Sequence, residues 1–181
     1  MKTLIKKALV AVGLMHPAMG VKISAERKVT ILRSYWKPGM EIFVETGTEF
    51  GGTIKGVRDL FISIYSVELD PEKYHTARRM FKDDANIHLY HGNSGEEIRN
   101  IMKLVDRPAL VWLDAHGPGE VNFENSPIRE ELDVVLSHAH HHVVLIDDAR
   151  HFPVPVIEEI KRMAKEYGYK YELQEGLFRL T

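Results

Sequence analysis

The chain has 181 residues, with 24 lysines and arginines against 26 aspartates and glutamates, so its net charge at pH 7 is -2. We expect residues 1–181 to form a single domain, and the mixed charges leave no extended basic face for nucleic acid. Because the sequence contains no cysteine, it excludes disulfides, thiolate metal sites and cysteine nucleophiles, and we expect a cytoplasmic protein.

The N-terminal segment is compatible with two structures. Three lysines precede the short apolar run 8–15, which is the outline of a signal peptide. The apolar residues between Leu4 and Val12 also have helical spacing, and we favour an amphipathic helix. A second helix is predicted over 24–36, so that residues 1–37 hold N-terminal helices. No apolar run reaches the length of a membrane span.

Residues 41–181 have the rhythm of an α/β core. Five mostly apolar runs end on polar residues that are 23, 23, 23 and 33 positions apart, namely Glu45, Glu68, His91, Asp114 and Asp147. This spacing is typical of βα units, and the apolar runs predict parallel strands that are buried on both faces. Two further runs, 169–173 and 177–180, flank a turn at Glu175-Gly176 that is short enough to force an antiparallel hairpin.

Helix-start signals follow three of these strands. Each signal combines a side chain that accepts a hydrogen bond from a free backbone N–H group with a residue favoured in the first turn. The signals are Asp70 before Pro71, Ser94 with Glu97, and Ser126 before Pro127.

A glycine-rich turn follows the first predicted strand, in the sequence Glu45-Thr46-Gly47-Thr48-Glu49-Phe50-Gly51-Gly52-Thr53. Nucleotide-like ligands bind at such turns in open α/β sheets. Glu45 and Glu49 would repel a pyrophosphate but suit a ligand with a sulfonium and an ammonium group, which describes S-adenosylmethionine. Thr53 stands where a phosphate-binding P-loop requires lysine. The residues expected to bind the cofactor here are Glu45, Gly47, Thr48 and Gly51.

The pattern Glu-x-Gly-x-x-x-Gly at 45–51 resembles motif I of class I S-adenosylmethionine-dependent methyltransferases. With Ser-Val-Glu-Leu-Asp at 66–70, Trp-Leu-Asp-Ala-His at 112–116 and Leu-Ile-Asp-Asp-Ala-Arg at 145–150, the chain looks like small members of this family that are similar to sugar O-methyltransferases. The resemblance implies a Rossmann-like fold with a mostly parallel seven-stranded sheet and a C-terminal antiparallel hairpin. It also implies S-adenosylmethionine as cofactor and methyl transfer to a hydroxyl of a small molecule or sugar.

The other strand ends supply further candidate cofactor ligands. Glu68 is placed to accept hydrogen bonds from both ribose hydroxyls, although a solvated acid would also suit a strand end. The segment with Asn93 and Ser94 resembles the family's adenine-binding Gly-Asp segment, or it simply caps a helix. By the same resemblance, Asp114 takes the position nearest the transferred methyl group.

Three carboxylates, on Asp114, Asp147 and Asp148, are expected to crowd one edge of the sheet, which is unfavourable unless a proton or a cation intervenes. Catechol-type and some sugar O-methyltransferases hold magnesium with such a trio, and hard oxygen ligands suit Mg²⁺. Alternatively, Asp147 or Asp148 binds backbone N–H groups or pairs with Arg150.

Asp114, His116 and His151 are the candidate general bases, because each lies at or just past an acidic strand end. The histidine cluster 138–142 lies at the opposite end of the fifth strand, and we interpret it as structural or solvated. The loop 117–125 is either a lid over the site or an ordinary connection.

Two other classes of function remain open. A protein with this fold can bind S-adenosylmethionine without transferring a methyl group. A metal-dependent hydrolase ranks lowest, because Asp114-Ala115-His116 is similar to a short arginase motif but the other motifs of that family are missing. In each case the expected partner is a small molecule.

Overall fold

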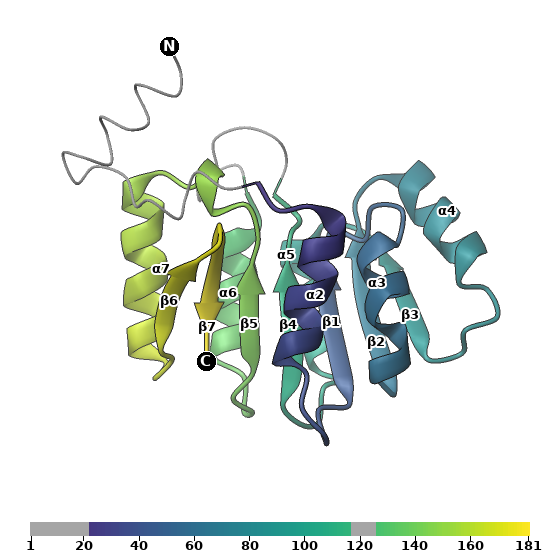
Figure 1. Cartoon of the computed structure of the whole chain (residues 1–181), viewed down its shortest axis with the longest axis horizontal. Helices are drawn as coiled ribbons and strands as arrows, with labels where there is room; N and C mark the ends of the chain where they lie inside the picture. Colours follow the sequence, from purple (N-terminus) through teal and green to yellow (C-terminus); the bar gives the residue numbers. More distant parts are fainter. Residues whose placement is uncertain (1–21, 117–125) are drawn as a thin grey trace, which may run out of the picture.

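A seven-stranded sheet forms the centre of the fold (Figure 1). The computed structural model describes residues 22–116 and 126–181. The strands are β1 (Ile42–Thr46), β2 (Ser63–Glu68), β3 (Ile87–His91), β4 (Ala109–Leu113), β5 (Val143–Ile146), β6 (Tyr171–Gln174) and β7 (Leu177–Leu180). Their order is β3-β2-β1-β4-β5-β7-β6. The strands β1 to β5 are parallel, and β7 runs antiparallel to both β5 and β6. The predicted fold class is confirmed.

Helices cover both faces of this sheet (Figure 1). They are α2 (Ala25–Tyr35), α3 (Gly52–Val57), α4 (Pro71–Met80), α5 (Ser94–Met102), α6 (Ile128–Leu136) and α7 (Val154–Glu166), with short 3-10 turns η2 (Arg58–Leu60) and η3 (Ala149–His151). On one face, α2, α3 and α4 bury a core that contains Leu32 and Phe43. On the other, α5, α6 and α7 bury a core that contains Ile98 and Val111. The apolar strands are therefore covered on both sides, as predicted.

Local signals set several boundaries of these elements. The Ser24 hydroxyl accepts a hydrogen bond from the Arg27 N–H group at the start of α2. The Asp70 carboxylate caps α4, which begins at Pro71. At the C-terminal hairpin, Glu175 and Gly176 have φ angles of 53° and 78°. Two-residue hairpin turns require this left-handed conformation, so the predicted turn is confirmed.

The start of α5 differs from the prediction. The Asn93 side chain accepts a hydrogen bond from the Gly95 N–H group at 2.9 Å, so Asn93 is the N-cap. Ser94 is instead the first helical residue, and it is buried. The capping box predicted from Ser94 and Glu97 is wrong, because a cap must lie outside the helix and asparagine fills that position as well as serine. At α6 the prediction is also wrong, because Pro127 and not Ser126 is the N-cap. The Ser126 hydroxyl nevertheless accepts from the Ile128 N–H group at 3.4 Å.

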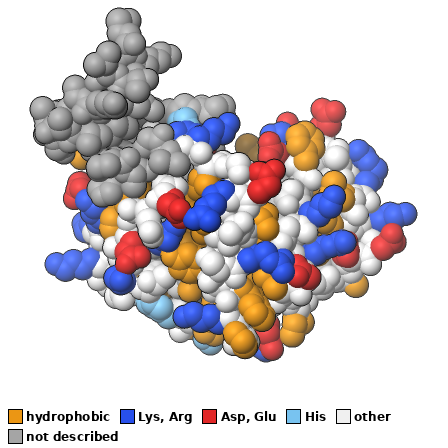
Figure 2. All heavy atoms as spheres, viewed as in Figure 1, with side chains coloured by type: hydrophobic (Ala, Val, Ile, Leu, Met, Phe, Trp, Pro, Cys, Tyr) orange, Lys and Arg blue, Asp and Glu red, His pale blue; other side chains and the backbone are white. Residues whose placement is uncertain are grey.

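Some predictions concern residues outside the described ranges. They are the choice between a signal peptide and an amphipathic helix within residues 1–21, and the choice between a lid and a connection at 117–125. None of the helices that the structure describes is both long enough and apolar enough to cross a membrane. Figure 2 shows basic and acidic side chains interspersed on the face that carries α2 and α3, with no continuous basic patch over the described part of that face.

Truncation of Leu32 tests whether α2 belongs to the core. The Leu32 side chain is fully buried, so Leu32→Ala should lower the free energy of unfolding by about 2–5 kcal/mol through lost burial and a residual cavity. Leu104→Ala is the matched control, because Leu104 is 52% exposed. This substitution should change the free energy of unfolding by less than about 0.5 kcal/mol. Urea titration measures both. Equal effects of the two substitutions would contradict the packing of α2 on the sheet.

Candidate active site

The register of the parallel strands brings the candidate residues to one edge of the sheet. Thr46 at the end of β1 pairs with Val67 of β2 and with Leu113 of β4, so the three strands end at the same level. A cavity of about 560 Å³ lies at this edge, between the β1 turn, the ends of β2 and β4, and the start of α2.

The predicted site residues divide into two groups around this cavity. Those that line it are Gly47, Thr48, Glu68, Asp114, His116 and Asp148. Those that do not are Glu45, Gly51, Asn93, Ser94, Asp147 and His151. Of the second group, Glu45 and Asp147 are fully buried close to the cavity, since both interact with its lining residues.

The glycine-rich turn passes very close to the end of β4. Gly47 has a φ angle of 84°, and a Cβ atom on it would lie 2.6 Å from the Asp114 carbonyl oxygen. Only glycine fits this position without a shift of the backbone. Several N–H groups of the turn already donate within the protein: Gly47 and Thr48 to the Val67 carbonyl, Gly51 to the Thr48 carbonyl, and Glu49 to the Glu68 carboxylate. These groups are therefore not available to a phosphate.

The Glu68 carboxylate is held in place by two backbone groups. Its Oε2 accepts a hydrogen bond from the Glu49 N–H group at 2.7 Å, and its Oε1 accepts from the Asp70 N–H group at 2.9 Å. An ionised carboxylate offers about four lone-pair positions. Glu68 therefore faces the cavity with a fixed orientation and with capacity to accept from two further donors.

Glu45 differs from the expectation of a charged residue beside the ligand. It is fully buried, the Ser66 hydroxyl donates to its Oε2 at 2.8 Å, and its Oε1 has no partner among the described residues. Burial raises the pKa of Glu45 to about 8, against the opposing effect of the Ser66 hydrogen bond. Near neutral pH this side chain is therefore largely protonated and adds little negative charge to the site.

A lysine ammonium lies between the carboxylates that end β4 and β5. Lys28 Nζ is 2.9 Å from Asp114 Oδ2 and also forms an ion pair with Asp147. The Asp147 side chain is fully buried, whereas those of Lys28 and Asp114 are each 22% exposed. Burial lowers the pKa of Lys28, but the two carboxylates outweigh burial and raise it. Burial and then the charge of Asp147 raise the pKa of Asp114 to about 7.

The three predicted magnesium ligands do not come together. Asp148 adopts a left-handed conformation with φ of 52°, and its carboxylate pairs with Arg150 Nη2 at 2.8 Å. The carboxylates of the other two, Asp114 and Asp147, both form ion pairs with Lys28. Within residues 22–116 and 126–181, no group of three or more histidine, aspartate or glutamate side chains is arranged to hold a metal ion. The described residues therefore do not support the predicted magnesium site, and the cation that lies between Asp114 and Asp147 is the Lys28 ammonium group.

The two histidines proposed as bases have different surroundings. The His116 ring lies edge-on to Phe152, with 5.0 Å between ring centres, and its Nε2 has no partner among the described residues. Burial lowers the pKa of His116 to about 4, so the ring is neutral near pH 7. His151 Nε2 accepts a hydrogen bond from Arg150 Nε at 2.9 Å. Only His116 of the two lines the cavity.

Two charged residues near the site were missed by the sequence prediction. Lys28 lies on the same helical face as Ile31 and Leu32, which are buried. Glu131 lies three residues after Ile128 on the apolar face of α6; burial raises its pKa to about 7, and the hydroxyls of Ser94 and Thr46 oppose this. A charged residue in an apolar helical stripe is the signal that would have identified both.

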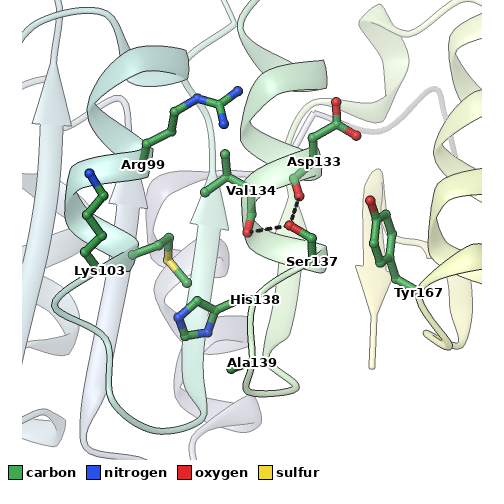
Figure 3. A pocket seen from close by; sticks show the side chains of 9 residues that line it. Arg99, Lys103, Asp133, Val134, Ser137, His138, Ala139 and Tyr167 are labelled. Atoms are coloured by element: carbon green, nitrogen blue, oxygen red, sulfur yellow. Dashed lines mark hydrogen bonds between the residues drawn. The ribbon is translucent and has the colours of Figure 1, made fainter.

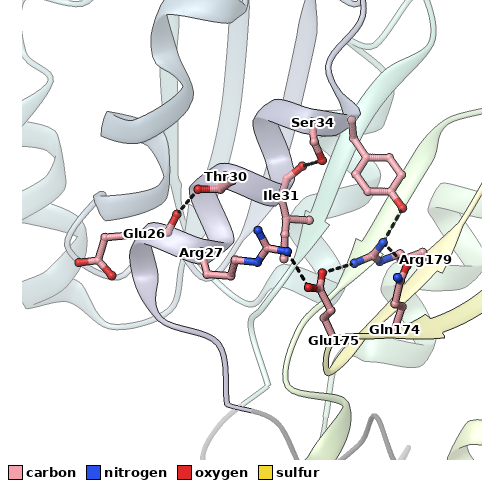
Figure 4. Close-up of polar contacts among 9 residues, drawn as sticks. Glu26, Arg27, Thr30, Ile31, Ser34, Gln174, Glu175 and Arg179 are labelled. Carbon is pink, nitrogen blue, oxygen red and sulfur yellow. Dashed lines mark hydrogen bonds and ion pairs between the residues drawn. The ribbon is translucent and has the colours of Figure 1, made fainter.

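Polar contacts attach α2 to the C-terminal hairpin (Figure 4). Arg27 Nη2 lies 2.6 Å from Glu175 Oε1, and Arg179 Nη2 lies 2.9 Å from Glu175 Oε2. Arg179 Nη1 also donates to the Tyr35 hydroxyl at 3.2 Å. The helix that carries Lys28 is therefore connected to the β6–β7 edge of the sheet through Arg27 and Tyr35.

A second hollow, of about 620 Å³, lies in the helical layer on one face of the sheet and shares no lining residue with the first cavity (Figure 3). It is formed by the C-terminal halves of α5 and α6 and by Tyr167, with Arg99, Lys103 and His138 at its rim. His138 Nδ1 lies 2.8 Å from His142 Nε2, and His142 Nδ1 accepts from the Ala109 N–H group. The histidine cluster therefore joins a loop to the start of β4 and is remote from the strand ends, in agreement with a structural role.

Comparisons with known proteins rest on structure. No protein-family model matches the sequence. No curated protein matches it either. A protein from Staphylococcus aureus assigned as a caffeoyl-CoA O-methyltransferase superposes with a TM-score of 0.61 at 14% identity, over 98% of this chain and 99% of its own. An O-methyltransferase from Bacillus cereus in complex with SAH gives 0.55 at 14% identity, over 97% and 87%. Fibrillarin from Aeropyrum pernix with natively bound S-adenosyl-L-methionine gives 0.57 at 15% identity, over 86% and 74%.

The chain has the Rossmann-like fold of class I methyltransferases. Within this methyltransferase fold, the glycine-rich turn and Glu68 lie on the β1–β2 side of the cavity. Lys28, Asp114 and His116 lie toward the β4 side. The cavity therefore has two chemically distinct halves.

The buried Glu45 predicts a pH-dependent stability. Its pKa is raised from the ordinary 4.5 to about 8, so the folded state binds this proton more tightly than the unfolded chain. Its contribution is fully present below about pH 4.5 and is lost as pH rises through about 8, by at most about 5 kcal/mol at about 1.4 kcal/mol per pKa unit. Glu45→Gln should therefore flatten the decline in unfolding free energy between about pH 5 and pH 8.5.

Urea titrations at these two pH values measure the effect. Glu72→Gln on α4 is the control, because Glu72 is exposed and should leave the decline as in the wild type. The raised pKa of Glu131 also makes the free energy of unfolding fall as pH rises, and this contribution remains in both variants. An unchanged pH dependence in Glu45→Gln would contradict the protonation of Glu45.

Proposed function

We propose that this cavity binds S-adenosylmethionine and that the protein transfers the methyl group to a hydroxyl oxygen of a small molecule or sugar. The observation that carries the proposal is the shared cavity of the glycine-rich turn, the oriented Glu68 carboxylate and Asp114. The methyltransferase fold supports it, because ligands of open α/β sheets bind at this edge. A metal-dependent hydrolase is not proposed, since the described residues form no metal-binding group.

The residues at the cavity suit this cofactor. Glu68 has lone pairs for two further donors, which suits the two hydroxyls of a ribose. Four N–H groups of the turn, those of Gly47, Thr48, Glu49 and Gly51, donate within the protein and are not available to a pyrophosphate. The carboxylates of Glu49 and Asp114 also line the cavity and suit the ammonium and sulfonium groups of this ligand. Lys22, Lys28, Lys73 and Arg150 line the same cavity, so the charge of the lining does not by itself exclude a phosphate.

When bound, S-adenosylmethionine supplies an electrophilic methyl group on a positively charged sulfur. The protein's contribution is to hold the acceptor oxygen in line with that methyl group and to remove its proton. Asp114 lines the cavity, and its raised pKa of about 7 is close to the operating pH of a general base. Asp114 is therefore the base of the proposal, with the neutral Nε2 of His116 as the alternative proton acceptor.

Cofactor selectivity is the first test. Calorimetric titration should show binding of S-adenosylmethionine and S-adenosylhomocysteine and weaker binding of NAD. Glu68→Ala should weaken binding of the first two by about 1–3 kcal/mol, because two buried hydroxyls lose their acceptor. Glu72→Ala removes an exposed carboxylate on the neighbouring helix and should leave the affinity unchanged. Tighter binding of NAD, or an unaltered affinity in folded Glu68→Ala, would contradict the assignment.

The pH dependence of turnover tests the base. With an acceptor found by screening small hydroxyl compounds, kcat/KM should fall as pH drops below about 7, because Asp114 is then protonated. Asp114→Asn should lower kcat by about 10²–10⁴-fold and remove this acidic limb. If His116 were the base, the limb would lie near pH 4 instead. Binding of S-adenosylmethionine without turnover of any acceptor would favour the non-catalytic binding protein.

A further inference from the structure

The two strand-end carboxylates hold a cation that the protein itself supplies. Asp147 is fully buried and Asp114 is largely buried, and two such carboxylates repel each other strongly unless a positive charge lies between them. Lys28 Nζ contacts both of them. The ammonium group therefore lies where a divalent cation would lie if these side chains were metal ligands.

Several contacts fix this ammonium group. Lys28 belongs to α2, which buries Ile31 and Leu32 one turn further on. The helix packs so closely on α3 that a Cβ atom on Gly56 would lie 2.3 Å from Val29 Cγ2. Lys28 Nζ also lies 5.8 Å from the centre of the buried Trp112 ring. The position of the ammonium group is thus fixed by the packing of α2, by the Trp112 ring of β4 and by the two carboxylates.

The ammonium group keeps one donor for a ligand. It has three N–H bonds, and its hydrogen-bond and ion-pair partners among the described residues are Asp114 and Asp147. Lys28 lines the cavity on the same side as Asp114 and His116. An oxygen atom next to Asp114 would therefore lie within reach of the third N–H bond.

We propose that Lys28 replaces the divalent cation of metal-dependent O-methyltransferases and binds the oxygen atom of the acceptor. This inference rests on the proposed methyl transfer. In the reaction, the acceptor hydroxyl loses its proton to the Asp114 carboxylate, and the oxygen forms a bond to the methyl carbon. The bond from that carbon to sulfur breaks, and its electron pair stays on sulfur. Lys28 stabilises the negative charge that develops on the oxygen.

This cation also restricts the class of acceptor. A divalent ion with open positions binds two neighbouring oxygens of a catechol or vicinal diol, whereas one remaining N–H bond binds a single oxygen. The site therefore binds an acceptor through one hydroxyl group, and a second adjacent hydroxyl does not increase the affinity. It also needs no added metal, because a side chain cannot be removed by a chelator.

Manganese binding tests the replacement without any turnover. Mn²⁺ takes the same oxygen ligands as Mg²⁺, and electron paramagnetic resonance measures the free ion. The wild type should bind no Mn²⁺ at this site and should have the same Tm in Mn²⁺ and in EDTA. Lys28→Met leaves Asp114 and Asp147 uncompensated, so this variant should gain Mn²⁺ binding, with Tm higher by at least about 4 °C in Mn²⁺ than in EDTA.

Matched variants make the result specific. Lys28→Arg keeps a positive charge and should gain no Mn²⁺ binding, and the same holds for Lys55→Met, which removes an exposed lysine of α3. Asp147→Asn added to Lys28→Met should abolish the gain. If Lys28→Met does not melt cooperatively, Lys28→Gln provides the same test. Failure of the folded Lys28 variant to gain Mn²⁺, or wild-type Mn²⁺ binding that Asp114→Asn removes, overturns the inference.

Turnover separates this inference from the proposed function. EDTA should leave wild-type methyl transfer unchanged, Lys28→Met should lower kcat by about 10²-fold, and a catechol should be no better an acceptor than the matching phenol. Transfer that EDTA abolishes would leave the proposed function intact and overturn the role of Lys28. If no acceptor is methylated but the Mn²⁺ results hold, the proposed function fails and the assignment of Lys28 as the cation of this site stands.

Discussion

The ion pairs of Lys28 with Asp114 and Asp147 are the interaction on which the candidate active site depends. A parallel sheet brings the ends of β4 and β5 together, and each strand is followed by an aspartate, of which Asp147 is fully buried and Asp114 is 22% exposed. Removing a charge from water is costly, and the mutual repulsion of two carboxylates adds to that cost. One ammonium group offsets both terms, and it does so only if α2 holds it at the sheet edge.

The position of α2 therefore has a functional meaning beyond the covering of apolar strands. This helix precedes the first βα unit of the chain, yet its lysine completes the site formed by the fourth and fifth strands. Burial of Leu32 and the contacts of Arg27 with Glu175 hold the helix on the sheet. Exposed ion pairs such as Arg27–Glu175 contribute little to stability by themselves, so the apolar face of α2 provides most of the anchoring.

Three acidic residues at this edge show how environment separates side chains of one chemical type. Glu45 is fully buried with one unpartnered oxygen, and burial favours its protonated form. Glu68 accepts hydrogen bonds from two backbone N–H groups and faces the cavity with a fixed carboxylate. Asp114 lies between these extremes, since burial and Asp147 raise its pKa while Lys28 lowers it. A hydrogen-bond acceptor, a neutral acid and a base thus occur at one edge of the sheet.

The sequence alone determined the order of strands and helices, the hairpin and the edge of the sheet at which the polar residues gather. It could do so because apolar periodicity, glycine in tight turns and polar strand ends are local properties of the chain. The tertiary structure decided which charges meet: Lys28 is 86 residues from Asp114, and no local pattern specifies that contact. It also decided that Asp148 pairs with Arg150 and that Asn93 caps α5, because neighbouring groups compete for each polar side chain. Charge balance in a buried site depends on distances across the fold, and these distances arise only when the helices pack on the sheet.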